Sequence, residues 1–424
     1  MSEQPPEESV PDELRRGLGV ADAVMIGLGS MIGAGIFVAL APAARAAGSG
    51  LLIGLGLAAL VAYCNATSSA RLAALYPTSG GTYVYGRIRL GDFWGYLAGW
   101  GFVVGKTASC AAIALTIGLY AWPDHAHVMA AISVMALTVV NYVGVAKSAL
   151  LTRVIISVVI TILAAATIAF FTTGTAAFDR LDIGADATIF GVLQAAGLLF
   201  FAFAGYARIA TLGEELQNPK RTIPKAIPLA LGITLVLYAV VAIAVLMVLG
   251  PERLSQATAP LSDAARVAGV DWLVPLVRIG ATLAALSSLL ALLLGVSRTV
   301  LAMSRDRHLP HFLSAVHPHF KVPHRAELVV GTVAAVLAAT TDIREAIGFS
   351  SFGVLVYYAI ANASAWTLSA AEGRPHRLIP AVGMAGCLTL AFTLPLASIL
   401  IGVTVLFAGI AVYGARRITA ARKP

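Results

Sequence analysis

The feature that most constrains this chain is a series of apolar stretches, each about as long as a membrane is thick. A helix crosses the hydrocarbon core of a bilayer with about 20 apolar residues, and twelve such stretches divide the 424 residues. Only 12% of the residues are charged, whereas a soluble domain has about 25%. The sequence therefore predicts an all-α polytopic membrane protein with twelve transmembrane helices in a lipid bilayer. The predicted spans are 20–44, 49–74, 93–121, 126–144, 148–173, 188–212, 225–249, 272–303, 326–341, 346–369, 378–395 and 396–414.

Lys and Arg are distributed unevenly between the two sides that these spans define. If the N-terminus is cytoplasmic, 21 of the 29 Lys and Arg lie in cytoplasmic segments, five in outer loops and three within spans. Cytoplasmic loops of membrane proteins carry such an excess. We therefore expect a multi-pass protein of the cell membrane with both termini in the cytoplasm. Topology accounts for the net charge of +8, so no nucleic-acid partner is expected.

Two spans carry glycines that favour a break at membrane depth. The first contains Gly27, Gly29, Gly33 and Gly35, and each glycine inside a helix costs up to about 1 kcal/mol relative to alanine. The sixth span, which opens the second half of the chain, carries Gly205 among aromatic residues. Glycines four residues apart also suit close helix packing. Interruptions at matching positions in two halves nevertheless indicate the binding site of a secondary transporter.

The chemistry of such breaks points to an amino acid as the ligand. The N-terminus of a half-helix offers free N–H groups and a positive dipole end to a carboxylate. Exposed carbonyl groups at the other half-helix ends suit an ammonium group or a cation. A molecule that carries both a carboxylate and an ammonium group fits both.

Five motifs follow one another along nearly the whole chain. They are Gly29-Ser-Met-Ile-Gly-Ala-Gly-Ile-Phe37, Tyr76-Pro-Thr-Ser-Gly-Gly-Thr-Tyr-Val-Tyr85, Asn141-Tyr-Val-Gly-Val145, Phe200-Phe-Ala-Phe-Ala-Gly-Tyr206 with Glu214-Glu-Leu-Gln-Asn-Pro-Lys-Arg-Thr-Ile-Pro224, and Ser297-Arg-Thr-Val-Leu-Ala-Met-Ser-Arg-Asp306 with Leu309-Pro310. Together they resemble the permeases of the amino acid–polyamine–organocation (APC) superfamily. The resemblance implies a LeuT-like inverted repeat of five plus five helices, with discontinuous helices one and six, and two additional helices. It also implies uptake coupled to H⁺ or Na⁺, or exchange, of amino acids and amines.

The resemblance divides the chain into five parts and assigns the substrate site. The parts are a cytoplasmic tail at 1–19, the first repeat at 20–173, the inverted second repeat at 188–369, two additional helices at 378–414 and a cytoplasmic tail at 415–424. The residues that resemble the helix-one backbone around the substrate carboxylate are Ser30, Met31, Ile32, Gly33, Ala34 and Gly35. Those that resemble the helix-six segment, which meets the ammonium group and forms an aromatic gate, are Phe203, Ala204, Gly205 and Tyr206.

Lys106 is the most unusual residue within a span, because it lies near the middle of span three. A lysine at the bilayer centre costs about 2.5–3.5 kcal/mol on insertion scales, so it normally faces a cavity or a partner. No acidic residue is expected at comparable depth. We expect Lys106 to bind an anionic part of the substrate or to carry a coupled proton. The alternative is a structural lysine bonded to the carbonyls of a broken helix.

Five further residues are candidates for coupling or gating. Glu214 and Glu215 resemble the acidic pair that the family carries at the cytoplasmic end of helix six, although both are also expected to pair with the basic residues that follow them. Arg208 borders the expected cytoplasmic vestibule, with pairing to these glutamates as the alternative. Ser287 and Ser288 offer hydroxyls for a sodium ion, but serine pairs are also common where membrane helices pack.

Two positions depart from the family pattern and bear on coupling. Arg71 stands where many relatives have a glutamate, and Val159 stands where many proton-coupled relatives have a lysine on helix five. We predict a permease for an amino acid or a related small amine or carboxylate, most simply a proton symporter. An exchanger, a sodium symporter and a non-transporting sensor remain alternatives. No enzyme motif, metal site or cofactor is expected, and Arg278 near the outer end of span eight is expected to snorkel.

Overall fold

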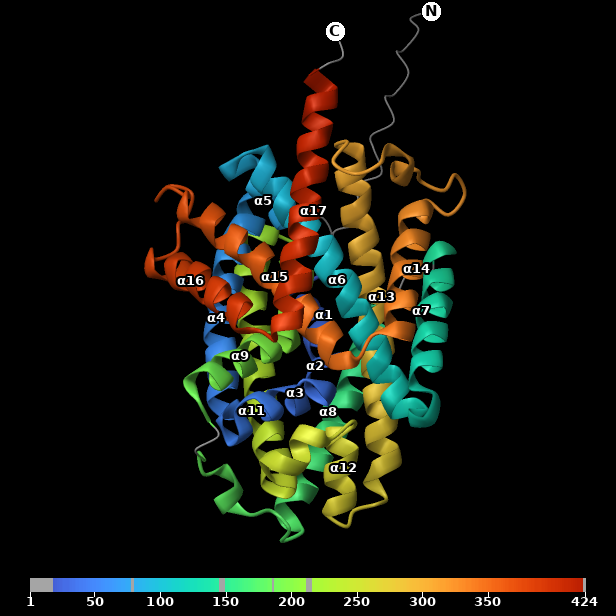
Figure 1. Cartoon of the computed structure of the whole chain (residues 1–424), viewed down its shortest axis with the longest axis vertical. Coiled ribbons are helices and arrows are strands. Elements are labelled where there is room, and N and C mark those ends of the chain that lie inside the picture. Colours follow the sequence, from blue (N-terminus) through green and yellow to red (C-terminus); the bar gives the residue numbers. More distant parts are fainter. Residues whose placement is uncertain (1–17, 78–79, 145–148, 185–186, 211–215, 422–424) are drawn as a thin grey trace, which may run out of the picture.

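The described part of the protein is built almost entirely of helices. The computed structural model describes residues 18–77, 80–144, 149–184, 187–210 and 216–421. Its elements are α1 (Val20–Ile32), α2 (Gly35–Val38), α3 (Leu40–Ala47), η1 (Gly48–Gly50), α4 (Leu51–Leu75), α5 (Thr82–Leu90), α6 (Asp92–Ala121), η2 (Pro123–His125), α7 (Ala126–Tyr142), α8 (Ala149–Thr172), η3 (Phe178–Leu181), α9 (Ile189–Phe203), η4 (Ala204–Tyr206), α10 (Ala207–Ala210), α11 (Pro219–Gln256), α12 (Pro260–Val267), α13 (Leu273–Arg305), η5 (His311–Ser314), α14 (His324–Thr340), α15 (Ile343–Trp366), α16 (Leu378–Thr393) and α17 (Leu396–Ala421). Figure 1 shows α5 and the last turns of α17 at one end of the bundle, called the α5 end below, and α12 at the other.

Helices occupy all twelve positions where spans were predicted. Within the described residues, ten segments are long and apolar enough to cross a membrane. The remaining two, α14 and α16, have only 17 and 16 residues. An all-helical, multi-pass membrane protein is therefore confirmed, whereas the count of twelve spans stays a prediction at these two helices.

Both predicted interruptions are present in the backbone. Span one stops at Ile32 and resumes at Gly35. It is interrupted again at Ala39, which was not predicted. The cause is Pro42, because a proline has no N–H to donate to the carbonyl of Val38 four residues earlier. Span six changes from an α-helix to one 3-10 turn at Ala204 before α10 begins.

The two interruptions touch each other. A Cβ atom on Gly205 would lie 2.3 Å from the carbonyl oxygen of Ser30 and 2.6 Å from the amide nitrogen of Met31. A Cβ atom on Gly35 would lie 2.4 Å from the Cβ of Ala202. Glycine is therefore required at these positions because two backbones cross there without room for a side chain.

The helix that contains span seven begins six residues before the predicted start of the span. Residue 225 was expected to open this helix, whereas α11 begins at Pro219. Proline fits the first helical position, where its missing N–H has no intrahelical partner in any case. Asn218 precedes it with φ of 51°, and at the far end Gly250 kinks the helix with φ of 69°. Residues 219–224, which were expected in the loop before span seven, thus form the first turns of this helix.

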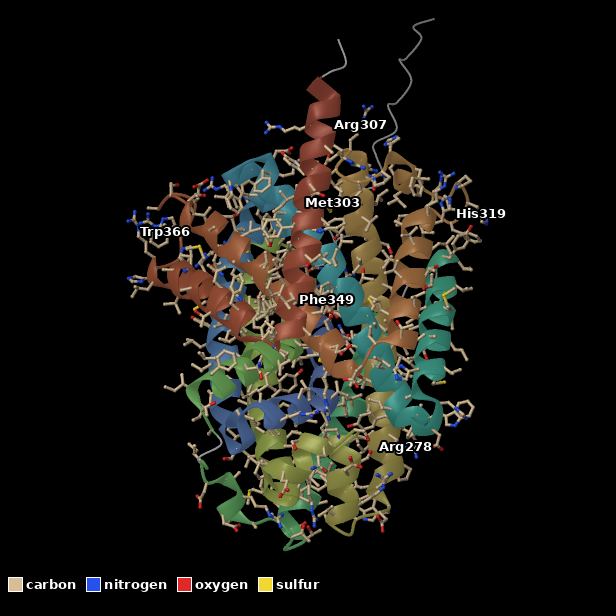
Figure 2. All side chains as sticks on the ribbon, viewed as in Figure 1. Arg278, Met303, Arg307, His319, Phe349 and Trp366 are labelled. Atoms are coloured by element: carbon tan, nitrogen blue, oxygen red, sulfur yellow. The ribbon has the colours of Figure 1, made fainter. Side chains whose placement is uncertain are left out.

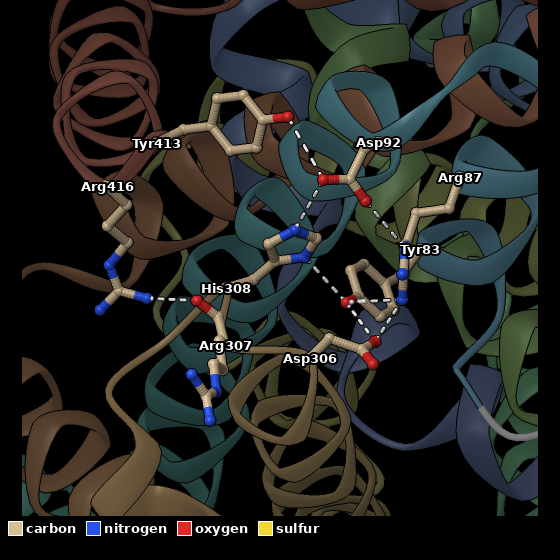
Figure 3. A network of polar contacts seen from close by, with 8 residues as sticks. All are labelled: Tyr83, Arg87, Asp92, Asp306, Arg307, His308, Tyr413 and Arg416. Carbon is tan, nitrogen blue, oxygen red and sulfur yellow. Dashed lines mark hydrogen bonds and ion pairs between the residues drawn. The ribbon is translucent and has the colours of Figure 1, made fainter. Parts of the chain in front are cut away.

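A polar network joins four elements at the α5 end (Figure 3). Asp92 at the start of α6 accepts hydrogen bonds from Arg87 of α5 at 3.1 Å and from Tyr413 of α17 at 3.3 Å, and its carboxylate lies 3.1 Å from Nε2 of His308. Asp306, which follows α13, accepts from Arg87 and from the hydroxyl of Tyr83. These contacts connect α5, α6 and α17 to the end of α13.

A second polar cluster lies inside the bundle, between α4, α15 and α16. Asn362 donates to Oδ1 of Asn65 at 2.6 Å and accepts from Ser68 at 2.7 Å. The thiol of Cys387 also donates to Oδ1 of Asn65. Both asparagines are fully buried, so this cluster fixes the register of α15 against α4.

Candidate functional site

A cavity of about 100 Å³ lies beside the two crossing breaks and extends toward the α5 end. α6, α13 and α15 complete its wall. Its lining residues are Ser30, Met31, Ala34, Gly35, Gly80, Phe102, Lys106, Ser109, Ile113, Phe201, Ala204, Gly205, Ala207, Arg208, Ser288, Ala291, Leu292, Gly295, Arg298, Thr299 and Tyr357. The cavity therefore combines backbone of both broken helices with basic, hydroxyl and aromatic side chains.

Seven of the eleven predicted substrate residues line this cavity, and four do not. Those that line it are Ser30, Met31, Ala34, Gly35, Lys106, Ala204 and Gly205. Ile32 is fully buried among helices. Gly33 packs against Ser288, since a Cβ atom there would lie 2.4 Å from the Cβ of that serine. The segment of helix one predicted for the substrate thus meets the cavity at two pairs of neighbouring residues, separated by Ile32 and Gly33.

The predicted aromatic residues of helix six point into helix packing. The ring of Phe203 lies 5.3 Å from that of Tyr238 on α11, and the ring of Tyr206 lies 5.2 Å from that of Tyr358 on α15. Phe201 lines the cavity instead. Two residues along an α-helix differ by about 200°, so Phe201 and Phe203 face nearly opposite sides.

Lys106 lies in the cavity wall and also touches the helix-six break. Its side chain is buried with 6% exposure, and Nζ donates to the carbonyl of Ala204 at 3.3 Å. Among the described residues it makes no ion pair with a carboxylate. Lys106 therefore makes the structural hydrogen bond to the broken helix and also lines the cavity where a ligand would bind. An ammonium group has three donors, and among the described residues one of them is used.

Two more basic side chains line the cavity. Arg208 was a predicted gating residue, whereas Arg298 was missed because the sequence counted it among the basic residues of the cytoplasmic side. No Asp or Glu is among the described lining residues. Glu214 and Glu215, the predicted acidic pair, lie outside the described part of the chain. The described wall is thus cationic.

The two serines considered for sodium are separated by the structure. Ser288 lines the cavity and contacts Gly33 of the helix-one break, whereas Ser287 is buried outside the lining. Ser109 and Thr299 add two hydroxyls to the wall. The hydroxyl of Ser109 bonds that of Ser350 on α15. The cavity therefore offers neutral oxygen atoms but no described carboxylate oxygen.

Carbonyl groups freed by the breaks are bound by tyrosines from other helices. The hydroxyl of Tyr238 lies 2.5 Å from the carbonyl oxygen of Met31 and 3.2 Å from that of Ala202. Tyr120 of α6 donates to the carbonyl of Phe37 at 2.8 Å. Sequence reasoning missed these residues, although a tyrosine inside an apolar span needs a hydrogen-bond partner.

The aromatic wall opposite the breaks comes from α6 and α15. The rings of Phe102 and Tyr357 lie 5.0 Å apart, and both side chains line the cavity. The hydroxyl of Tyr357 accepts from the amide of Thr82 at 3.0 Å. This bond connects the cavity wall to the first turn of α5 and hence to the network at the α5 end.

Arg278 lies away from the cavity, near the end opposite to Arg307 and His319 (Figure 2). That it snorkels stays a prediction. Its guanidinium donates to the carbonyls of Tyr120 at 2.6 Å and Ala121 at 3.0 Å. These are terminal carbonyls of α6, which have no intrahelical partner and attract positive charge.

Comparison with known proteins shows the family of the chain. A family model described as amino acid permease matches residues 18–416. An uncharacterized transporter of Mycobacterium tuberculosis is 72% identical over 413 residues, which cover 97% of this chain and 94% of the relative. A branched-chain amino acid permease of Bacillus subtilis is 28% identical, over 94% of this chain and 92% of its own. A cationic amino acid transporter of Arabidopsis thaliana is 30% identical, over 83% of this chain and 65% of its own.

Proposed function

The chain belongs to the amino acid permease family, and from this premise we propose that it is a secondary active transporter for an amino acid or a related small amine or carboxylate. The observation that carries the proposal is the cavity beside two crossing helix breaks. A helix break leaves backbone N–H and C=O groups without the intrahelical partners that a regular helix supplies. A small zwitterion is the ligand that this arrangement suits.

The substrate is proposed to carry an extra negative charge. Lys106 supports this, because its buried ammonium group is bonded only to a neutral carbonyl among the described residues. An opposite charge at 4 Å gains about 4 kcal/mol at an effective dielectric constant of 20. A cationic side chain would meet a repulsion of the same size. The alternative role for Lys106 is to carry the coupled proton.

The transport cycle is proposed to be alternating access in a LeuT-like inverted repeat. The α5 end would be cytoplasmic, in keeping with the excess of Lys and Arg on that side. Proton symport is the proposed coupling mode. The rival modes are sodium symport, for which Ser288 supplies a hydroxyl at the helix-one break, and exchange of one amino acid for another.

Uptake into proteoliposomes tests the proposal. The purified protein is offered labelled glutamate, leucine, arginine or a simple amine, with an inward proton gradient imposed. Gradient-driven uptake of any of them supports the transporter, and selective uptake of glutamate supports a role of Lys106 in binding. Absence of uptake and of counterflow, with protons or sodium and with every substrate, would contradict it.

Two substitutions at Lys106 separate its proposed roles. Lys106→Gln retains a donor for the Ala204 carbonyl but removes the charge, whereas Lys106→Ala removes both. Loss of preference for an anionic substrate in both variants indicates binding. Loss of pH dependence with unchanged preference indicates coupling. Unchanged preference and unchanged pH dependence would reject both roles.

A further inference from the structure

Glu327 is a buried carboxylate that has no hydrogen-bond partner among the described residues. It lies in the first turn of α14, and its side chain is only 2% exposed. Neither Oε1 nor Oε2 makes a hydrogen bond to any residue that the structure describes. Isolated ionised carboxylates are strongly disfavoured away from water, so such a group takes up a proton or acquires a cationic partner. Ionisable residues within membrane spans are rare and usually functional.

Arg298 connects this carboxylate to the cavity. Among the titratable side chains of the described residues, Arg298 of α13 is the one whose charge acts on the Glu327 carboxylate. Arg298 also lines the cavity beside the helix breaks. Because Arg298 acts on the Glu327 carboxylate and also lines the cavity, the protonation of Glu327 is sensitive to what occupies the cavity.

The other elements packed against α14 offer Glu327 no competing charge among the described residues. These elements are α7, α6 and η5. At the corresponding end of α6, Asp92 is held by the network at the α5 end and Tyr96 donates to the Gly409 carbonyl. α7 contributes Tyr142, whose ring packs against His324. The remaining groups nearby are bonded elsewhere: Arg325 donates to the Phe312 carbonyl, and His311 in η5 contacts Ser314.

We propose that Glu327 binds and releases the proton that drives transport, in response to movement of Arg298 on the cavity wall. This inference rests on the proposed transport function. In the described conformation this role requires a neutral carboxyl that carries its proton. When α13 brings Arg298 closer, the O–H bond breaks, the proton passes to water of the open pathway, and the carboxylate pairs with the guanidinium. Return of a proton from water reverses the step. Lys106 is then left for the substrate.

The test separates substrate movement from proton coupling. The full-length protein in proteoliposomes is given labelled glutamate or leucine in two assays, counterflow without a gradient and accumulation driven by a pH gradient. If one proton moves with each substrate molecule and the pH gradient is the only driving force, the substrate can be accumulated by at most about tenfold per pH unit. Glu327→Gln, which mimics the protonated side chain, is expected to keep counterflow and to lose accumulation above the outside concentration. Glu327→Asp is expected to keep both.

A matched control variant and a second measurement distinguish loss of proton coupling from loss of the fold. Glu345→Gln changes another first-turn glutamate, on α15, that is exposed, and it should leave both assays unchanged. Infrared difference spectra should show a protonated carboxyl band in the wild type and in the Glu345→Gln variant. The same band should be missing in Glu327→Gln.

The outcomes for coupling and for transport are distinguishable. Undiminished accumulation by Glu327→Gln, or a wild type without a protonated carboxyl band at neutral pH, would overturn the role of Glu327. Counterflow without any proton-driven accumulation in the wild type would also overturn it, while leaving a transporter of the exchange type. Absence of counterflow in the wild type would overturn the proposed function itself and this inference with it.

Discussion

Replacing Gly205 with alanine tests whether the two helix breaks must touch. The added methyl carbon would lie 2.3 Å from the carbonyl oxygen of Ser30, 2.4 Å from its carbonyl carbon and 2.6 Å from the amide nitrogen of Met31. Carbon atoms in contact are normally about 3.5–4.0 Å apart, so one backbone must move by about 1 Å. Neither neighbour is a flexible side chain that could turn away.

The expected loss follows from this overlap. Overpacking of a filled interior typically costs about 1–3 kcal/mol, which outweighs the roughly 0.5–1 kcal/mol that alanine gains over glycine within a helix. Gly205→Ala should therefore unfold at a lower temperature, by at most about 2–4 °C for each kcal/mol. Uptake should fall as well, because the cavity wall at Ala204 and Ser30 is displaced.

A matched glycine provides the control. Gly232 lies in α11 and has no atom within 4 Å of a Cβ position, so Gly232→Ala should be neutral or stabilising. Both variants are purified in detergent, heated, and scored by the fraction that remains folded on size exclusion. Equal unfolding temperatures for Gly205→Ala and the wild type, with equal uptake, would refute the reasoning that the breaks are in obligatory contact.

Three further substitutions each test one contact of the described structure. Tyr238→Phe leaves the carbonyls at both breaks without their hydroxyl donor and should cost about 1–3 kcal/mol, seen as a lower unfolding temperature; an unchanged temperature would show that water replaces the hydroxyl. The hydrogen bond from Arg89 lowers the pKa of Glu372 to about 2 from 4.5. A lowered pKa stabilises the fold above pH 4.5, and this stabilisation is lost as the pH falls from 4.5 through about 2. The unfolding temperatures of the wild type and Glu372→Gln should therefore differ above pH 4.5 and converge as the pH falls from 4.5 to about 2. Arg278→Met removes the donor to the Tyr120 carbonyl at the end of α6 and should cost about 1–2 kcal/mol, with Arg278→Lys recovering part of it.

The sequence predicts the breaks well because their cause is local. Gly33, Gly35 and Gly205 stand at or beside the interruptions, and a glycine-rich segment is weak as a helix wherever it is placed. The orientation of side chains after a break is a different matter. Phe203 was predicted at the substrate and Phe201 lines the cavity, because the phase of the helix is set by packing against α11 and α15, which no local pattern reveals.

Long-range partners are the other part that sequence reasoning missed. Tyr238 binds a carbonyl 207 residues earlier, and the sequence shows only a tyrosine in an apolar span. Glu327 was overlooked because an acidic residue in the first turn of a helix is favourable there and normally solvated. Only the packing of α14 shows that this side chain is buried. Lys106 was recognised because a basic residue at mid-span has no such ordinary explanation.

The buried pair of Asn65 and Asn362 has a consequence for synthesis and membrane insertion of the protein. Both donors to Oδ1 of Asn65, from Asn362 and Cys387, belong to the second half of the chain. A ribosome adds about 5–20 residues per second, so the 297 residues from Asn65 to Asn362 take about 15–60 s to follow. During this time α4 sits in or beside the bilayer with an amide that its own half of the protein cannot pair. The first half of the chain therefore waits for the second, and a chain that stops in between exposes a polar group to lipid.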